Sequence, residues 1–211
     1  MASDKYSLKT GLVTDYSEEI LKIREILKGL IKESRYEHSL GVSYISAALA
    51  MRYGADLRKA EIAGLVHDCA KGYKDSELIE KCLKHGITLS EDIIKSPQVI
   101  HACYGAYFAQ KQFGIEDPEI LHAVYYHTVG RPDMTLLEKI VFTADYIEPR
   151  RSKADRLPEI RRLAFTDLDR AVYEILHDTV EYLESREAFI CRESLETLEY
   201  YKNKLSDEQS A

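Results

Sequence analysis

The stretch Ala63-Gly-Leu-Val-His67-Asp68-Cys-Ala-Lys71 decides how this sequence is interpreted. The residues around His67 and Asp68 are apolar on nearly every side, which predicts a central helix and not a surface helix. A buried aspartate is costly unless it is paired or bound to a cation. For an isolated His-Asp pair, a histidine at a helix end whose proton the aspartate accepts is the commoner explanation. Residues elsewhere in the chain are needed to distinguish that explanation from a metal site.

Four further residues with nitrogen or oxygen donors extend the pair along the chain. They are His38, His101, His127 and Asp145. Imidazole and carboxylate donors without a thiolate suit iron, manganese or zinc in a hydrolytic site. The ordered set of six donors, formed by these four residues with His67 and Asp68, therefore predicts a metal centre.

Each histidine also has an ordinary explanation when it is considered alone. His38 can lie on the exposed edge of its helix, and His101 can cap its helix or face solvent. His127 falls at a predicted helix C-terminus, where the helix dipole favours a protonated imidazole. We expect the three remaining histidines to be surface or hydrogen-bonded imidazoles outside the site. They are His85, His122 and His177.

Helical periodicity and helix-boundary residues account for nearly the whole chain, which predicts an all-α fold. Asp56 and Asp117 are suited to cap helix N-termini, and Gly54 is suited to end a helix. No alternating apolar run of strand length occurs, so we expect no sheet. We predict helices over 20–31, 38–53, 56–70, 75–86, 97–114, 117–130, 135–147, a short one from 158, 168–185 and 193–205.

The length of 211 residues fits one domain. We expect a core over 18–150, and a C-terminal helical part of the same domain over 151–205 that packs on this core. Residues 1–17 and 206–211 are expected to be tails. The segment 151–165 is charged and rich in arginine, and we interpret it as a mobile loop over the core that contains the start of the short helix.

Composition limits the compartment and the partners. The net charge of -7 disfavours a polynucleotide-binding surface, which needs clustered basic residues. A small anionic ligand is compatible with it, because a metal ion can supply the local positive charge. The four cysteines form no C-x-x-C pair, and no apolar run approaches the ~20 residues of a membrane span. The first 19 residues lack the apolar segment of a signal peptide. We expect a cytoplasmic protein that binds neither nucleic acid nor membranes.

Three blocks of the sequence resemble the HD-domain superfamily of metal-dependent phosphohydrolases, and more closely its symmetrical bis(5′-nucleosyl)-tetraphosphatases. The blocks are Arg35-Tyr-Glu-His38-Ser-Leu-Gly-Val, the stretch 63–71, and the segment from His101-Ala-Cys-Tyr-Gly-Ala through Tyr126-His127-Thr128-Val-Gly130-Arg to Ala144-Asp145-Tyr-Ile-Glu148-Pro-Arg-Arg151. The resemblance covers roughly residues 18–205, and its Asp-x-x-Glu-Pro pattern is the most specific part. It implies an HD-domain helical bundle.

The resemblance also implies which residues form the site. His38, His67, Asp68 and Asp145 would bind iron, while His101 and His127 would face the phosphates or hold a second ion, with Asp68 bridging. Contact with the nucleotide is implied for His38, Asp68, Cys69, Ala70, Lys71, His101, His127, Thr128, Asp145, Arg151 and part of the last helices. Catalytic roles fall to Asp68, Lys71, His101 and His127.

One position departs from the pattern of the family. Relatives often carry glycine where this chain has Arg150, so we assign the phosphate-binding arginine of the family to Arg151 and no role to Arg150. Tyr6, Tyr73, Tyr125 and Tyr126 are candidates for stacking on a base, although most of the 15 tyrosines are expected to pack in the core.

The resemblance implies hydrolysis of a dinucleoside tetraphosphate to two nucleoside diphosphates, with Lys71 and Arg151 neutralising the phosphates. One alternative is another HD-type nucleotide phosphohydrolase, such as a nucleotidase or a hydrolase of cyclic nucleotides or alarmones. The other is a nucleotide sensor that has lost catalysis. The base preference, and whether the chain forms a homodimer, are not written in the sequence.

Overall fold

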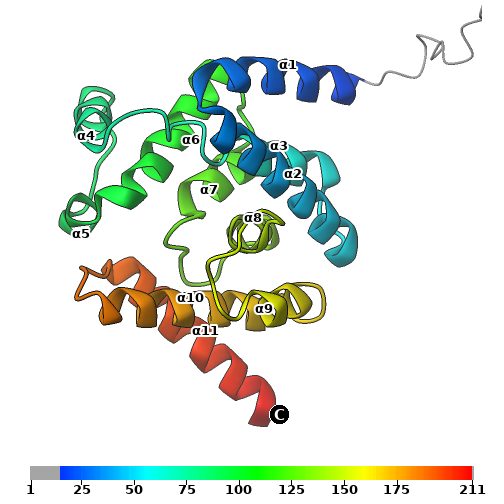
Figure 1. The fold of residues 1–211 in the computed structure, drawn as a ribbon, viewed down its shortest axis with the longest axis vertical. Helices are drawn as coiled ribbons and strands as arrows, with labels where there is room; N and C mark the ends of the chain where they lie inside the picture. The colour runs from blue at the N-terminus through cyan, green and yellow to red at the C-terminus, as the bar shows by residue number, and fades with distance from the viewer. Residues whose placement is uncertain (1–14, 211) are drawn as a thin grey trace, which may run out of the picture.

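The computed structural model describes residues 15–210, and this part of the chain contains helices and loops but no strand. The helices are α1 (Asp15–Leu30), α2 (Glu33–Tyr53), α3 (Leu57–Val66), α4 (Asp75–Lys84), α5 (Glu91–Lys95), the 3₁₀ helix η1 (Pro97–Val99), α6 (Ile100–Phe113), α7 (Pro118–Tyr126), α8 (Leu136–Ile147), α9 (Leu157–Ala164), α10 (Leu168–Ser185) and α11 (Arg192–Ser210) (Figure 1). The all-α prediction is confirmed. Within 15–210, no helix combines the length and the apolar character that spanning a bilayer requires.

Several helix boundaries lie where the sequence predicts them. The side chain of Asp56 accepts a hydrogen bond from the amide of Lys59 at 2.9 Å. Asp117 caps α7 in the same way, accepting from the amide of Glu119 at 2.9 Å. Gly54 ends α2 with φ of 74°, a left-handed conformation that glycine adopts without strain. These signals act over a few residues, so the sequence alone locates them.

Other elements differ from the sequence predictions. α2 begins earlier, at Glu33, and α11 continues to Ser210, through most of the segment expected to be a tail. Because α5 has only 5 residues, it gives too little periodicity to be recognised, and the prediction misses it. The interpretation of 151–165 as a loop is wrong for its second half, where α9 runs from 157 to 164 and buries apolar side chains.

α3 is the central helix of the fold, packed against α2, α7 and α8. All of its residues from Ile62 to Val66 are buried. The close approach to α2 requires glycine at position 64, because a Cβ there would lie 2.7 Å from the hydroxyl oxygen of Ser46. This contact brings the C-terminal end of α3 beside the N-terminal half of α2, where His38 lies.

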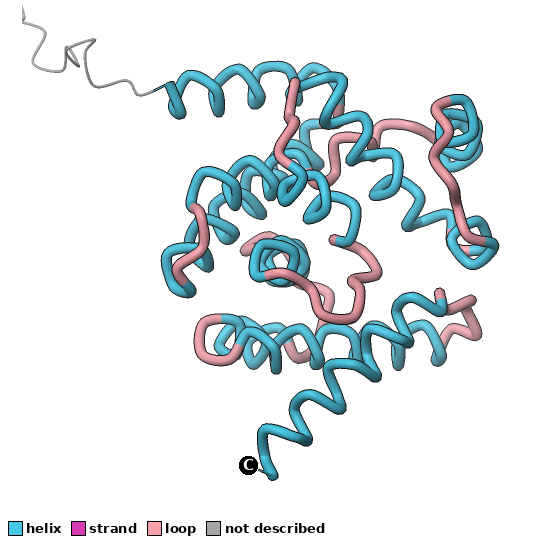
Figure 2. Tube along the Cα trace, turned by 180° about the vertical axis from the view of Figure 1, so that it is seen from behind, coloured by secondary structure: helices cyan, strands magenta, loops and turns pink. Residues whose placement is uncertain are grey.

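α8 separates the two parts of the domain. It contacts α2, α3 and α7 on one side and α9 and α10 on the other. In Figure 1, α8 is seen nearly end-on between the upper helices and a lower layer formed by α9, α10 and α11. Figure 2 shows the same layer from behind, with α11 crossing α10. The predicted packing of the C-terminal helices on the core is therefore observed.

Candidate metal centre and substrate pocket

His67 and Asp68 lie where α3 ends, in a run of tight turns, and not within a helix continuing to residue 70 as predicted. The amide of Cys69 donates to the carbonyl of Val66 at 3.0 Å, and that of Lys71 donates to the carbonyl of Asp68 at 2.9 Å. His67 is fully buried and Asp68 is 3% exposed. Two consecutive polar side chains therefore both enter the interior.

Four of the predicted donors meet at one point, the first donor cluster. The Nε2 of His38 lies 3.3 Å from Nε2 of His67 and 2.9 Å from Oδ1 of Asp145. The Oδ2 of Asp68 lies 3.5 Å from Nε2 of His67 and 3.9 Å from Nε2 of His38. These atoms come from α2, α8 and the end of α3, so folding is required to bring them together.

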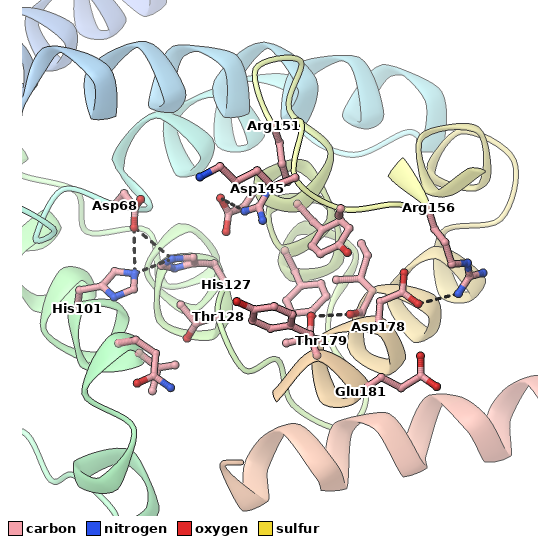
Figure 3. Close-up of a pocket in the computed structure, with 18 of the residues that line it drawn as sticks. Asp68, His101, His127, Thr128, Asp145, Arg151, Arg156, Asp178, Thr179 and Glu181 are labelled. Carbon is pink, nitrogen blue, oxygen red and sulfur yellow. Dashed lines mark hydrogen bonds and ion pairs between the residues drawn. The ribbon is translucent and has the colours of Figure 1, made fainter. Parts of the chain in front are cut away.

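The second donor cluster shares Asp68 with the first. The other carboxylate oxygen, Oδ1, lies 3.0 Å from Nε2 of His101 on α6 and 3.6 Å from Nε2 of His127 at the end of α7. The two Nε2 atoms are 3.2 Å apart, and Figure 3 shows the three side chains converging. Asp68 thus presents one oxygen to each cluster, which is the arrangement of a bridging carboxylate.

Backbone carbonyls orient two of the imidazoles. Nδ1 of His67 donates to the carbonyl of Gly64 at 2.8 Å, and Nδ1 of His127 donates to the carbonyl of Val124 at 2.7 Å. Because a carbonyl only accepts hydrogen bonds, Nδ1 carries the proton in each ring. Each Nε2 therefore points into its donor cluster, where a metal ion can take the place of any proton that it carries.

Glu148 orients His38, and the sequence prediction misses it as a site residue. Its Oε1 lies 3.3 Å from Nδ1 of His38, opposite the nitrogen that enters the first cluster. A Cβ at Gly41 would lie 2.7 Å from the other oxygen of Glu148, so glycine at 41 leaves room for this carboxylate. The signal was present in the sequence, because Glu148 belongs to the Asp-x-x-Glu-Pro pattern.

The charges of the clusters are strongly coupled. Burial works against the charged form of His67, but the carboxylates of Asp68 and Asp145 outweigh it and raise the pKa of His67 to about 10. Burial also opposes ionisation of both carboxyls, yet the neighbouring histidines hold the pKa of each well below its usual range. Burial lowers the pKa of His101 to about 4, so this ring is neutral and able to act as a ligand at pH 7. The anionic carboxylates, buried at Asp68 and half-buried at Asp145, create the demand for positive charge that a cation meets.

The donor set fits a metal ion. His38, His67 and Asp145 offer ligand atoms that all lie within 4.8 Å of one another, and so do His67, Asp68 and His127. All of these atoms are nitrogen or oxygen, which suits first-row metals such as iron, manganese and zinc.

A pocket of about 860 Å³ opens beside the two clusters and extends toward α10 (Figure 3). Several residues that the sequence assigns to substrate binding line it. They are Asp68, Lys71, His101, His127, Thr128, Asp145 and Arg151. The guanidinium of Arg151 lies over the ring of Tyr146, 5.0 Å from its centroid. The structure thus brings four of the six predicted donors and the predicted phosphate-binding side chains to one cavity, whereas His38, also assigned to substrate binding, and His67 do not line it.

Other predicted contacts lie elsewhere. The side chains of Cys69 and Ala70 are buried in the core and do not line the pocket, and the thiol of Cys69 donates to the backbone carbonyl of Gly105 at 3.6 Å. Arg150, which received no role, pairs with Glu37 at 2.9 Å on the exposed surface. Arg150 therefore faces the protein surface, whereas the neighbouring Arg151 faces the pocket.

Two cations border the clusters. Nη1 of Arg35 donates to Oδ2 of Asp68 at 2.7 Å, and the sequence prediction assigns Arg35 no role although it opens the first motif. Nζ of Lys71 lies 2.9 Å from Nδ1 of His101 and donates to the carbonyl of Gln98 at 3.2 Å. Both side chains line the pocket, so both are placed to meet an anionic substrate.

The three histidines that we expected outside the site, namely His85, His122 and His177, lie outside the two clusters. His85 stacks on Tyr107 with ring centroids 4.5 Å apart. His122 contacts the ring of Tyr126 on its own helix, and His177 lies on α10, 40% exposed, beside Glu181.

Of the tyrosines proposed for stacking, Tyr73, Tyr125 and Tyr126 do not line the pocket beside the clusters. Tyr73 packs against Tyr104 and Phe108, and Tyr125 and Tyr126 line a smaller cavity. Tyr6 lies outside the described residues.

Comparisons with known proteins agree with this geometry. The model of the HD domain matches residues 35–150, a range that contains all six donors. The chain belongs to the HD domain family. Curated relatives named symmetrical bis(5′-nucleosyl)-tetraphosphatase occur in Bacillus subtilis, 41% identical over 74% of this chain and 83% of the relative, and in Halalkalibacterium halodurans, 37% identical over 83% and 93%. The crystal structure of a Clostridium acetobutylicum chain, titled a predicted HD superfamily hydrolase involved in NAD metabolism, matches with a TM-score of 0.84. It is 38% identical, and the match covers 87% of this chain and 96% of that one.

An arginine of α9 fixes the segment of this HD domain that follows Asp145. Arg161 donates from Nε to the carbonyl of Ile147 at 3.0 Å, and from Nη2 to the carbonyls of Glu148 and Arg151 at 2.9 and 3.0 Å. The last carbonyls of a helix have no partner within the helix, so a tertiary donor can hold them in place. Arg161 thereby connects the C-terminal layer to the turn after Asp145, which carries Glu148 and Arg151.

We expect Asp68→Asn and Asp145→Asn to differ in metal content. Asp68 belongs to both donor clusters, so its replacement should strip metal from both, whereas loss of Asp145 should affect only the first. Elemental analysis after loading and dialysis measures this. If Asp68→Asn keeps as much metal as the wild type, Asp68 does not bridge.

Arg161→Met is expected to lower metal affinity or kcat by ~10- to 100-fold, the range found when partners that orient metal ligands are removed. The matched control is Arg162→Met, which changes the neighbouring, exposed arginine of the same helix. Metal titration and steady-state kinetics provide the measurements. Equal effects of the two substitutions would show that α9 needs charge and not these three hydrogen bonds.

Proposed function

We propose that this HD-family chain hydrolyses dinucleoside tetraphosphates symmetrically and releases two nucleoside diphosphates. The observation that carries the proposal is the carboxylate of Asp68, shared by two donor clusters in the wall of a pocket that Lys71 and Arg151 also line. The names of curated relatives at 37% and 41% identity give this activity for those proteins and support its assignment here.

Iron is the metal that we propose, with manganese or zinc as alternatives of similar ligand preference. His38, His67, Asp68 and Asp145 would hold one ion, and Asp68, His101 and His127 would hold a second. Such ions, when bound, lower the pKa of a water ligand toward ~7 and polarise phosphoryl oxygens.

The remaining pocket residues would act on the phosphate chain. Water adds to one of the two inner phosphorus atoms, and the bridging oxygen leaves with the other nucleoside diphosphate. Lys71 and Arg151 would neutralise the charge that accumulates on this leaving group, and the hydroxyl of Thr128 would donate to a phosphoryl oxygen. A diphosphate stabilised in this way is a good leaving group without a separate proton donor.

The product pattern tests the proposal. A dinucleoside tetraphosphate should yield only nucleoside diphosphate, because the clusters and cations would hold the middle of the phosphate chain. Chromatography of the metal-loaded reaction, with ¹⁸O-labelled water to show that one of the two diphosphates acquires the label, provides the measurement. Monophosphate and triphosphate as main products would reject symmetrical cleavage, and an absence of turnover across a nucleotide panel would reject the hydrolase.

Arg151→Ala should raise KM and lower kcat together, because this guanidinium would bind phosphate charge in both the ground state and the transition state. Arg150→Ala is the matched control, since the neighbouring side chain pairs with Glu37 on the surface. Steady-state kinetics on the dinucleoside substrate measure both variants. Equal losses would show that the charge of this segment matters and not the place of Arg151 in the pocket.

A further inference from the structure

The pocket extends well beyond the donor clusters, into a region that we call the α8–α10 arm. The arm is lined by Tyr146 of α8 and by Ile175, Asp178, Thr179 and Tyr182 of α10. Figure 3 shows Asp178 and Thr179 across the pocket from Asp68 and His101. The total volume of about 860 Å³ falls in the range of ~300–1,000 Å³ typical of sites that enclose a whole organic ligand.

The lining of the arm differs chemically from the region around the clusters. Tyr182 is 58% exposed, a large aromatic side chain that faces a cavity and not the core. Tyr146 of α8 and Asp178 of α10 line the same cavity, so the two helices form facing parts of its wall. Two aromatic rings and an isoleucine suit a flat and largely uncharged group.

The guanidinium of Arg156, which also lines the pocket, is already engaged. Nη1 of Arg156 donates to Asp178 at 2.7 Å, and Nη2 donates to Glu174 at 2.9 Å and to Glu159 at 3.2 Å. Because three carboxylates neutralise this guanidinium, it is poorly placed to bind a further phosphate. Lys71, Arg151 and Lys153 also line the pocket, and they provide the positive charge that is open to a phosphate chain.

The proposed reaction requires that a nucleoside reach such a region. Attack at an inner phosphorus centres the phosphate chain on the clusters, so one half of the substrate extends outward on each side. Arg151 lies between the clusters and the arm, 3.9 Å from Oδ1 of Asp145 and over the ring of Tyr146. A half that passes Arg151 therefore enters the α8–α10 arm.

We propose that the α8–α10 arm is a nucleoside subsite, in which one base packs against Tyr182 and Tyr146 and the ribose hydroxyls donate to Asp178. This inference rests on the proposed function and adds to it the binding site of one half of the substrate. Stacking on aromatic side chains tolerates any base, so the subsite favours a nucleoside without selecting strongly among bases.

Tyr182→Leu tests the subsite, because this exposed residue can be changed without disturbing the core. Removal of one aromatic stacking partner should lower kcat/KM for the dinucleoside tetraphosphate about tenfold, mainly through KM. Tyr182→Phe retains the ring and should behave like the wild type. The matched control is Tyr44→Leu, a tyrosine of α2 that is 55% exposed and outside the pocket.

A competitive inhibitor with a single nucleoside shows whether the effect of Tyr182→Leu is confined to the arm. A nucleoside 5′-tetraphosphate can place its only nucleoside on the other side of the clusters, so its inhibition constant should change less than twofold in Tyr182→Leu. Equal weakening of substrate and competitor, or no effect on either, would overturn the subsite. Turnover of the dinucleoside tetraphosphate by the wild type in the same assay tests the proposed function separately, since it does not depend on Tyr182.

Discussion

The organisation of this HD domain depends on a single carboxylate. Asp68 is buried, and a buried charge persists only when its surroundings compensate for the loss of water. Imidazoles from α2, α6, α7 and the end of α3 converge on its two oxygens, and Arg35 adds a hydrogen bond from the pocket side. These helices are far apart in the chain, so charge compensation at Asp68 depends on the fold that brings them together.

Three imidazoles of the donor clusters are in turn oriented by groups that only accept hydrogen bonds. Backbone carbonyls fix the rings of His67 and His127, and the carboxylate of Glu148 faces His38. Such contacts leave each Nε2 free for a ligand and restrict the ring to one orientation. Arg161 extends the same principle to the backbone, because it holds the carbonyls that follow α8. The C-terminal layer therefore contributes to the precision of the centre as well as to the walls of the pocket.

The six donors could be predicted from the sequence because their residue types, order and flanking patterns carry the signal. The helix caps at Asp56 and Asp117 were equally accessible, since a cap involves atoms only a few residues apart. Distant contacts decide features that local patterns do not carry. Cys69 and Ala70 directly follow His67 and Asp68, yet packing places their side chains in the core, so their contact with a nucleotide stays a prediction that only their backbone could fulfil. The segment 151–165 appeared to be a loop because its charges suggest exposure, whereas the ion pairs of Arg156 attach it to α10.

By itself, the sequence determined the all-helical fold, the donors and the chemical class of the site, because helix periodicity and ligand chemistry are properties of neighbouring residues and of side-chain type. Only the tertiary structure decided which oxygen of Asp68 faces which cluster, that Arg161 of α9 holds the carbonyls that follow α8, and that α8 and α10 form an arm beyond the clusters. These features depend on how helices far apart in the chain approach one another. That approach is fixed by the close contact at Gly64 and by the side chains packed around α8, which no local pattern records.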